Sequence, residues 1–271
     1  MPVTERDGVK VWRRRDRRSQ FSIWLGWFFG TLLFVQAWRL VSEHTIWDFA
    51  LDAPVQAWDL MVRMVPPRWS YIDSLWRPMW DTLNIATLGT LLSIAIAFPI
   101  AFLAARNTTP GLVFVRPAAL LMIVSSRSIN SLIWALLLVT VVGPGVLAGI
   151  IAIALRSIGF IGKLLYEAIE ETDRVQVEAI TATGASRPQQ LTYGVLPQIM
   201  PAFAGISVYR WDINIRESTV LGLVGAGGIG LQLNASVSRL AWNEVTVIFI
   251  VIFVTVIVSE WVSAKVRHAI I

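Results

Sequence analysis

Long apolar runs separated by short polar segments dominate the pattern along the chain. A transmembrane helix needs about 20 mostly apolar residues to cross the hydrocarbon core of a bilayer. Several runs reach or approach that length. The pattern therefore predicts an all-α, polytopic membrane protein with about six transmembrane helices, at residues 21–41, 81–105, 117–142, 145–162, 198–223 and 244–264.

Two features interrupt these runs. Pro99 lies inside the second run, where proline removes a backbone hydrogen bond and predicts a kink. The polar stretch SSRSIN, residues 125–130, divides the third run. We therefore expect both spans to depart from a single straight helix.

The regions around the first span differ in character. Residues 1–20 form a basic arm, and no small-residue cleavage site follows 21–41, so we expect that helix to be retained. Segment 42–80 is rich in tryptophan and acidic residues, which suits an interfacial amphipathic helix on the outer leaflet. An ordinary folded loop fits that segment equally well. Residues 81–271 form the core, with a more polar segment at 163–197.

Composition and charge support the membrane interpretation. Hydrophobic residues make up 55% of the 271 residues and charged residues only 15%, against about 25% charged in soluble domains. The chain has no cysteine and two distant histidines, which excludes thiolate sites and argues against a metal centre. The net charge of +5 comes from basic residues beside the apolar runs, as in positive-inside loops rather than a nucleic-acid surface. With six spans, both termini are expected to be cytoplasmic.

The segment 163–197 is too polar to span a membrane. Residues 167–184 consist mostly of good helix formers and predict one helix. Gly184 suits a helix end in the left-handed conformation, and Ser186 with Pro188 predicts the start of a second short helix. The expected cytoplasmic structure is therefore helix, glycine turn, helix.

A glycine-rich stretch, VGAGGIG at residues 224–230, matches the dinucleotide-binding pattern G-x-G-x-x-G. That site needs a strand before the glycines, a helix after them and a second strand ending at an acid such as Glu244. Here an apolar span precedes the glycines and another follows Glu244, so we interpret the match as coincidental. The glycines Gly225, Gly227, Gly228 and Gly230 instead predict a flexible or closely packed outer loop.

The polar segment carries a recognisable pattern. The stretch EAITATGASRPQQLTYGVLP, residues 178–197, resembles the EAA loop of ABC importer permeases. The matching positions are Glu178, Ala179, Gly184, Leu196 and Pro197. Ile180 and Gly194 depart from the pattern at packing positions, while the glutamate and the turn glycine are retained.

The resemblance extends over about residues 81–250. LAARNTTP, IGFIGKLLYEAIEETD and NIRESTVLGLVGAGGIG are similar to permeases of the phosphonate, phosphite and phosphate type. The resemblance implies a type I ABC importer permease fold, a homodimer, two cytoplasmic ATPase subunits and an extracytoplasmic binding protein. It also implies that the 167–184 helix couples to the ATPase, through Glu167, Glu170, Glu178, Ala179 and Gly184, and that residues 225–230 belong to an external gate.

No Walker A motif occurs in the chain. ATP and Mg²⁺ are therefore expected to bind a partner ATPase, with no cofactor and no catalytic residue in this chain. We expect a transport subunit rather than an enzyme.

Polar residues inside the predicted spans are candidates for a substrate path, because charges in the bilayer are costly and usually functional. Asp212 and Arg216 are spaced to pair on one helix face, whereas Arg127 has no nearby acid and suits an oxyanion. The arginines could instead hold the helices together by pairing with Asp212 or Glu217. The candidates are Ser125, Ser126, Arg127, Ser128, Asn130, Arg210, Asn214, Arg216, Glu217 and Ser218.

Other functions remain open at this point. A secondary transporter of a small anion would also combine several spans with buried charges, but inverted repeats are expected there and none is evident. An ABC permease for another cargo, such as an amino acid, would share the EAA-like segment. A membrane enzyme would need clustered acids or histidines, whereas the acids here are scattered.

Overall fold

The computed structural model describes residues 3–6, 8–12 and 17–270 and divides into two compact units, Met1–Asp59 and Leu60–Ile271. In the first unit, β1 (Val3–Arg6) and β2 (Val9–Trp12) pair antiparallel, with Val3 opposite Trp12. The expected basic arm thus contains a hairpin. Three of its arginines, at positions 13–15, lie outside the described residues.

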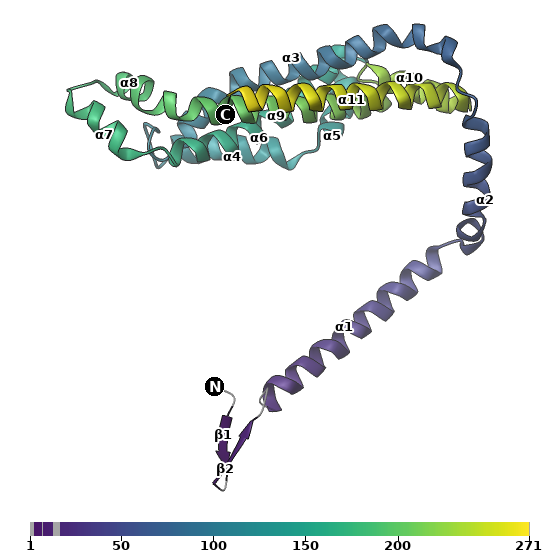
Figure 1. Cartoon of the computed structure of the whole chain (residues 1–271), viewed down its shortest axis with the longest axis horizontal. Coiled ribbons are helices and arrows are strands. Elements are labelled where there is room, and N and C mark those ends of the chain that lie inside the picture. Colours follow the sequence, from purple (N-terminus) through teal and green to yellow (C-terminus); the bar gives the residue numbers. More distant parts are fainter. Residues whose placement is uncertain (1–2, 7, 13–16, 271) are drawn as a thin grey trace. The chain divides into compact units, whose positions relative to one another are not determined.

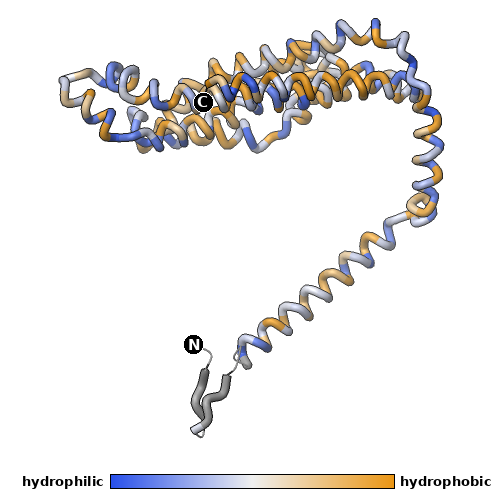
Figure 2. Tube along the Cα trace, in the orientation of Figure 1, coloured by the Kyte–Doolittle hydropathy of each residue, from blue (hydrophilic) through white to orange (hydrophobic). Residues whose placement is uncertain are grey.

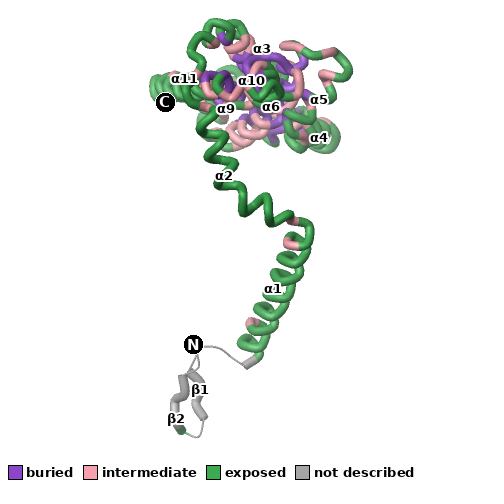
Figure 3. Tube along the Cα trace, turned by 90° about the vertical axis from the view of Figure 1, so that its right-hand side faces the viewer, coloured by how far each residue is buried: buried purple, intermediate pink, exposed green. Residues whose placement is uncertain are grey.

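Helix α1 (Arg17–His44) carries the first predicted span. Its apolar residues, such as Trp24 and Phe28, are exposed, and Figure 3 shows nearly the whole helix in the colour of exposed residues. Apolar residues alternate with residues of neutral hydropathy along it (Figure 2), and its mean hydropathy of 1.4 with no residue of that stretch buried is typical of a helix surrounded by lipid rather than by protein.

Helix α2 (Trp47–Met64) accounts for much of segment 42–80 and has no buried residue. A helix therefore forms where the sequence left a helix and a loop equally open. Its position on the outer leaflet stays a prediction. A 3-10 turn, Trp69–Tyr71, connects this segment to the core.

The core unit is built from long helices that run side by side, with short helices at the two ends (Figure 1). α7 and α8 lie at one end, and α10 lies at the other. The elements are α3 (Ile72–Ala104), α4 (Val115–Ser128), α5 (Ser131–Val142), α6 (Val146–Glu170), α7 (Arg174–Ala182), α8 (Arg187–Gln190), α9 (Leu196–Leu221), α10 (Ile229–Ser238) and α11 (Trp242–Ile270).

The all-α membrane fold is confirmed. Among the described residues, five helices are long and apolar enough to span a bilayer, and the count is six if α4 and α5, which meet at a bend of 89°, are taken together as one broken span. The bend falls at the predicted polar interruption. α3 begins nine residues before the predicted start at 81, and α10 was missed because ten residues are too few to give a span-length signal.

Close helix packing centres on α6. Gly89 of α3 meets α6 so closely that an added Cβ would lie 2.8 Å from Ile153 Cγ2. Gly149 of α6 makes a similarly close contact: a Cβ added there would lie 2.7 Å from the Ala226 carbonyl oxygen. Lipid provides no hydrophobic driving force between helices, so membrane helices rely on such small residues for van der Waals contact. Buried Ile85 and Ile153 fill the space beside these contacts.

The glycine-rich loop between α9 and α10 is tightly packed, and its second half, residues 226–228, is buried. The Gly145 amide donates to the Gly225 carbonyl at 3.0 Å, and the Ile229 amide donates to Thr82 Oγ1 at 2.8 Å. Gly225, Gly227 and Gly228 have positive φ. Helix α9 precedes the loop and α10 follows it, so the strand–helix–strand context of a dinucleotide site is absent from this described region.

Gly230→Ala tests this packing. An added Cβ would lie 2.0 Å from the Thr219 carbonyl oxygen, and that backbone atom cannot rotate away. We expect destabilisation at or above the ~1–3 kcal/mol typical of overpacking, measured as a lower midpoint of thermal unfolding in detergent. Gly30→Ala in α1, where a Cβ meets nothing within 4 Å, is the control. An unchanged midpoint for Gly230→Ala would contradict the packing.

Candidate functional site

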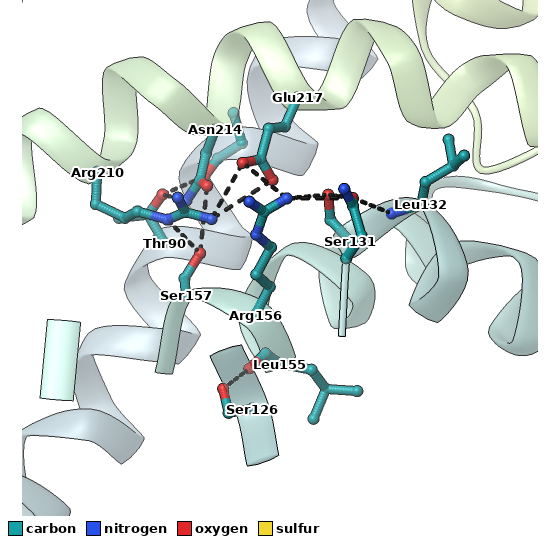
Figure 4. A network of polar contacts seen from close by, with 12 residues as sticks. Thr90, Ser126, Ser131, Leu132, Leu155, Arg156, Ser157, Arg210, Asn214 and Glu217 are labelled. Atoms are coloured by element: carbon teal, nitrogen blue, oxygen red, sulfur yellow. Dashed lines mark hydrogen bonds and ion pairs between the residues drawn. The ribbon is translucent and has the colours of Figure 1, made fainter. Parts of the chain in front are cut away.

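A network of polar side chains lies between α3, α5, α6 and α9, inside the membrane core (Figure 4). Its members are joined by hydrogen bonds and ion pairs, and we call it the central network. It consists of Thr90, Asn130, Ser131, Arg156, Ser157, Arg210, Asn214 and Glu217.

Arg210 is the buried cation of the central network. Its Nε donates to Ser157 Oγ at 2.9 Å, and its Nη2 lies 3.4 Å from both carboxylate oxygens of Glu217. The guanidinium also lies over the Phe160 ring, 5.1 Å from the ring centroid. A charge at mid-bilayer costs about 2.5–3.5 kcal/mol on insertion scales, and these contacts offset that cost.

Asn214 extends the network to α3. Its Nδ2 donates to Thr90 Oγ1 at 2.7 Å, while its Oδ1 accepts from Ser157 Oγ at 3.2 Å. All three side chains are buried. The amide therefore joins α3, α6 and α9 through neutral hydrogen bonds beside the ion pair.

Arg156 is the more accessible cation of the network. Its Nη1 lies 3.4 Å from Glu217 Oε1 and donates to Asn130 Oδ1 at 3.2 Å and to Ser131 Oγ at 3.3 Å. Two arginines thus share one carboxylate. The central network carries a net charge of +1 when all three groups are ionised.

The network brings together four of the predicted path residues, Asn130, Arg210, Asn214 and Glu217. Arg210 pairs with Glu217, which lies seven residues, or two helical turns, further along the same helix. This pair lies within α9, and it is Arg156 of α6 that forms an ion pair with Glu217 between two helices.

Arg216 and Ser218 lie outside the network. Arg216 pairs with Asp212, as the spacing predicted, and Asp212 also accepts a hydrogen bond from Ser259 of α11 at 2.9 Å. The Ser218 hydroxyl bonds the Ile215 carbonyl of its own helix at 2.8 Å. These residues contribute to helix packing rather than to the shared arginine cluster.

Arg127 stands apart from every acid, as predicted: among the described residues it has no ion-pair or hydrogen-bond partner. Its aliphatic stem passes over Gly159 of α6, where an added Cβ would lie 2.5 Å from Arg127 Cγ. Ser126 bonds the Leu155 carbonyl and accepts from the Gly159 amide, so it links α4 to α6. Ser125 and Ser128 bond carbonyls of their own helix.

The sequence reasoning missed Arg156, Ser157 and Thr90. Arg156 is a cation within the apolar run 145–162, so the cost of a charge in lipid was a sufficient signal to identify it. Ser157 and Thr90 gave no such signal, because single hydroxyl residues are common in apolar helices. Only their contacts with Arg210 and Asn214 reveal their place.

The polar segment 163–197 contains a break between two helices where one helix was predicted over 167–184. α6 ends at Glu170, and Asp173 starts α7 by accepting a hydrogen bond from the Val175 amide at 2.9 Å. The prediction failed because good helix formers continue through a capping aspartate that can begin a new helix.

Glu167 and Glu170 consequently belong to α6. Glu167 pairs with Lys163 of the same helix. Glu170 lies 3.6 Å from Arg116 Nη2 and accepts from the Arg106 amide at 2.9 Å. These carboxylates hold the end of α6 and the neighbouring loop, instead of lying on α7.

The remaining features of this segment follow the prediction. Gly184 has φ +80°, and α8 starts after Ser186, whose amide donates to Gln189 Oε1 at 2.8 Å. Glu178 and Ala179 are exposed on α7. Glu178 borders a groove of about 400 Å³ that Arg174, Arg187 and Asn107 also line.

A second ion cluster closes the opposite end of the core. Glu244 at the start of α11 is nearly buried and lies 2.9 Å from Arg68 Nη1 and 3.1 Å from Arg239 Nη2. Its Oε2 also accepts from Ser236 Oγ at 3.2 Å. The acid that matched the offset of a ribose ligand therefore ties the segment before α3 to α10.

Within the described residues, no group of three or more histidine, cysteine or acidic side chains is arranged to hold a metal ion. The polar chemistry of the core consists of guanidinium, carboxylate, amide and hydroxyl groups. These groups bind anions and polar solutes through hydrogen bonds and charge.

Comparison with known proteins places this arrangement in context. The chain is 42% identical over 204 residues to the phosphite transport system permease protein PtxC of Stutzerimonas stutzeri, covering 75% of this chain and 74% of that protein. It is 40% identical over 233 residues to the phosphate-import permease protein PhnE of Mycolicibacterium smegmatis, covering 84% of this chain and 43% of the relative.

Solved structures share the fold at low sequence identity. The MetNI methionine ABC transporter, in inward facing conformations, matches with a TM-score of 0.63 and 20% identity, over 73% of this chain and 96% of that chain. A bacterial alginate ABC transporter in complex with a pentasaccharide-bound periplasmic protein matches with a TM-score of 0.61 and 17% identity, over 93% and 97% of the two chains.

The pattern of a known family matches residues 97–264, more than half of the chain. The chain therefore belongs to the family of binding-protein-dependent transport system inner membrane components, and is a multi-pass membrane subunit of a transporter rather than an enzyme.

Proposed function

We propose that this subunit forms the translocation path for phosphonate or a related phosphorus oxyanion in an ATP-driven ABC importer. The names of the relatives, a phosphite permease and a phosphate-import permease, support this class of cargo. Phosphonate, phosphite and phosphate share a tetrahedral phosphorus centre and negatively charged oxygens. Guanidinium groups bind such oxygens with paired hydrogen bonds.

The charge balance of the membrane core is the observation that carries the proposal. Glu217 compensates only one of the two arginines in the central network, and Arg127 has no acidic partner among the described residues. The opposite charges of Asp212 and Arg216 cancel, because the two side chains form an ion pair. Excess positive charge is costly in a bilayer, and its retention favours an anionic cargo over a zwitterionic amino acid.

The partners follow from the same proposal. A second copy of this chain would complete the path, two cytoplasmic ATPase subunits would supply the energy, and an extracytoplasmic binding protein would deliver the anion. ATP and Mg²⁺ would bind the ATPase, since this chain has no Walker A motif. In this arrangement α7, α8 and both termini face the cytoplasm, in a prokaryotic inner membrane.

Coupling to the ATPase is assigned to the segment around α7. Exposed Glu178 and Ala179, with the left-handed turn at Gly184, would enter a groove of the ATPase. Glu167 and Glu170 would support that segment from the end of α6 instead of touching the ATPase. At the opposite end, the loop Gly225, Gly227, Gly228 and Gly230 would form part of the external gate.

Arg127→Ala tests the substrate path. Removing the cation should lower ATP-dependent uptake of phosphite or phosphate about tenfold, the equivalent of one charged hydrogen bond of ~1.5 kcal/mol. Dimer formation and ATPase assembly should be unaffected. Leu121→Ala, a truncation at an exposed apolar position of the same helix, is the control. Normal uptake by a well-expressed Arg127→Ala transporter would remove this residue from the path.

Glu178→Arg tests the coupling segment. Reversing the charge on exposed α7 should weaken capture of the ATPase in a pull-down and uncouple ATP hydrolysis from uptake. Glu171→Arg is a matched charge reversal just past the end of α6, and it lies outside the groove that Glu178 borders. The assignment fails if Glu178→Arg retains the ATPase as well as Glu171→Arg does.

A further inference from the structure

Two arginines with different surroundings share one carboxylate in the central network. The side chain of Arg210 is 3% exposed, that of Glu217 is 17% exposed and that of Arg156 is 32% exposed. The Nη2 of Arg210 and the Nη1 of Arg156 each lie 3.4 Å from Glu217 Oε1 (Figure 4). Glu217 therefore lies between a cation fixed in protein and a cation that is accessible.

Arg210 is held independently of Glu217. Ser157 accepts from its Nε at 2.9 Å, and the Phe160 ring lies beneath the guanidinium. Its Nη2 lies equally far from both oxygens of Glu217. Arg210 can therefore keep the carboxylate compensated even when no other cation contacts it.

Arg156 is held much more loosely. Every polar contact recorded for it in the described chain uses Nη1, at 3.2–3.4 Å. Charged N–H···O bonds usually measure about 2.7–2.9 Å, so these contacts are long. The Nε and Nη2 of Arg156 have no hydrogen-bond partner among the described residues, and two parallel donors are what bidentate binding of an oxyanion requires.

The break in the third span lies beside Arg156. α4 and α5 meet at a bend of 89°, and Asn130 caps α5 by accepting from the Leu132 amide at 3.1 Å while also accepting from Arg156. Irregular backbone at membrane depth is tolerated where it is buried in protein or lines a water-filled cavity. Arg156 is partly exposed at this break, so its free donors are accessible there.

We propose that Glu217 is a built-in competitor of the transported anion for Arg156. When the path is empty, the carboxylate contacts Arg156. When a phosphorus oxyanion arrives, it takes the free donors of Arg156 and displaces Glu217, which remains paired with Arg210. This exchange rests on the proposed function. In it, the carboxylate of Glu217 limits how tightly the path holds its cargo.

The exchange limits the positive charge that the path places in the bilayer. Without Glu217 the two arginines would place a charge of +2 in the bilayer, and they would retain an oxyanion too tightly for release. With Glu217, the net charge of the empty network falls from +2 to +1, and one anion replaces another on Arg156 when the cargo arrives. A transport path needs binding that is weak enough to let the substrate leave.

The pair Asp212–Arg216 provides a natural control on the same helix. Asp212 contacts Arg216 and Ser259, and none of its recorded contacts involves Arg156. Neutralising Asp212 therefore removes a buried carboxylate and leaves Arg216 without its acid, while the contacts of Arg156 stay unchanged, so the variant separates an effect at Arg156 from a general gain of positive charge.

The test uses the complete transporter, with its ATPase and binding protein, in proteoliposomes. Retention of labelled inorganic phosphate and phosphite is measured on the permease–ATPase complex, and uptake is measured on the full assembly. Glu217→Gln should increase retention about tenfold, the equivalent of one competing charged contact, and should slow turnover. Asp212→Asn should leave retention unchanged, and the double variant Arg156→Gln, Glu217→Gln should lose the gain.

Two results would overturn the exchange. One is wild-type retention and turnover in folded Glu217→Gln, or a gain that Asp212→Asn reproduces. The other is unchanged anion retention in Arg156→Gln. This variant leaves Glu217 paired with Arg210, so it tests the exchange even if Glu217→Gln does not fold. A wild-type transporter that imports neither anion contradicts the proposed function itself. If the wild type imports these anions but the variants retain them as the wild type does, only the exchange is contradicted.

Discussion

The cost of charge in an apolar medium governs the interior of this protein. Arg210 lies within a membrane-spanning helix and is almost completely buried, so it depends on Glu217 and Ser157 for compensation. The bond to Ser157 of α6 fixes the rotation of α9 against α6, and Asn214 fixes α9 against α3 through Thr90. The need to give each buried polar side chain a hydrogen-bond partner thus determines how three long helices face one another.

Close packing around α6 makes that polar arrangement possible. Gly149 admits the glycine-rich loop between α9 and α10, and Gly159 admits the stem of Arg127 and the hydroxyl of Ser126. Arg156 and Ser157 lie between these glycines on the same helix. One helix therefore carries the contact surface for α3, the link to α4 and two of the eight residues of the central network, and its far end supports the segment that precedes α7.

The sequence predicted the membrane spans, the break in the third span and the glycine turn at position 184, because each leaves a local signal. It did not predict the pairing of Arg210 with Glu217, since i,i+4 spacing was considered and two-turn spacing was not. Arg156 went unnoticed within an apolar run. The capping role of Asp173 was hidden in a stretch of good helix formers, and the neighbours of Thr90 depend on tertiary contacts that no local pattern encodes.

The central claim is that the uncompensated arginines make this subunit a path for phosphorus oxyanions. It is tested most directly by uptake into proteoliposomes that hold the chain with its ATPase and binding protein. The account predicts saturable, ATP-dependent uptake of labelled phosphite, phosphate or a phosphonate, and no uptake of methionine. Uptake of methionine without that of any phosphorus oxyanion would contradict it.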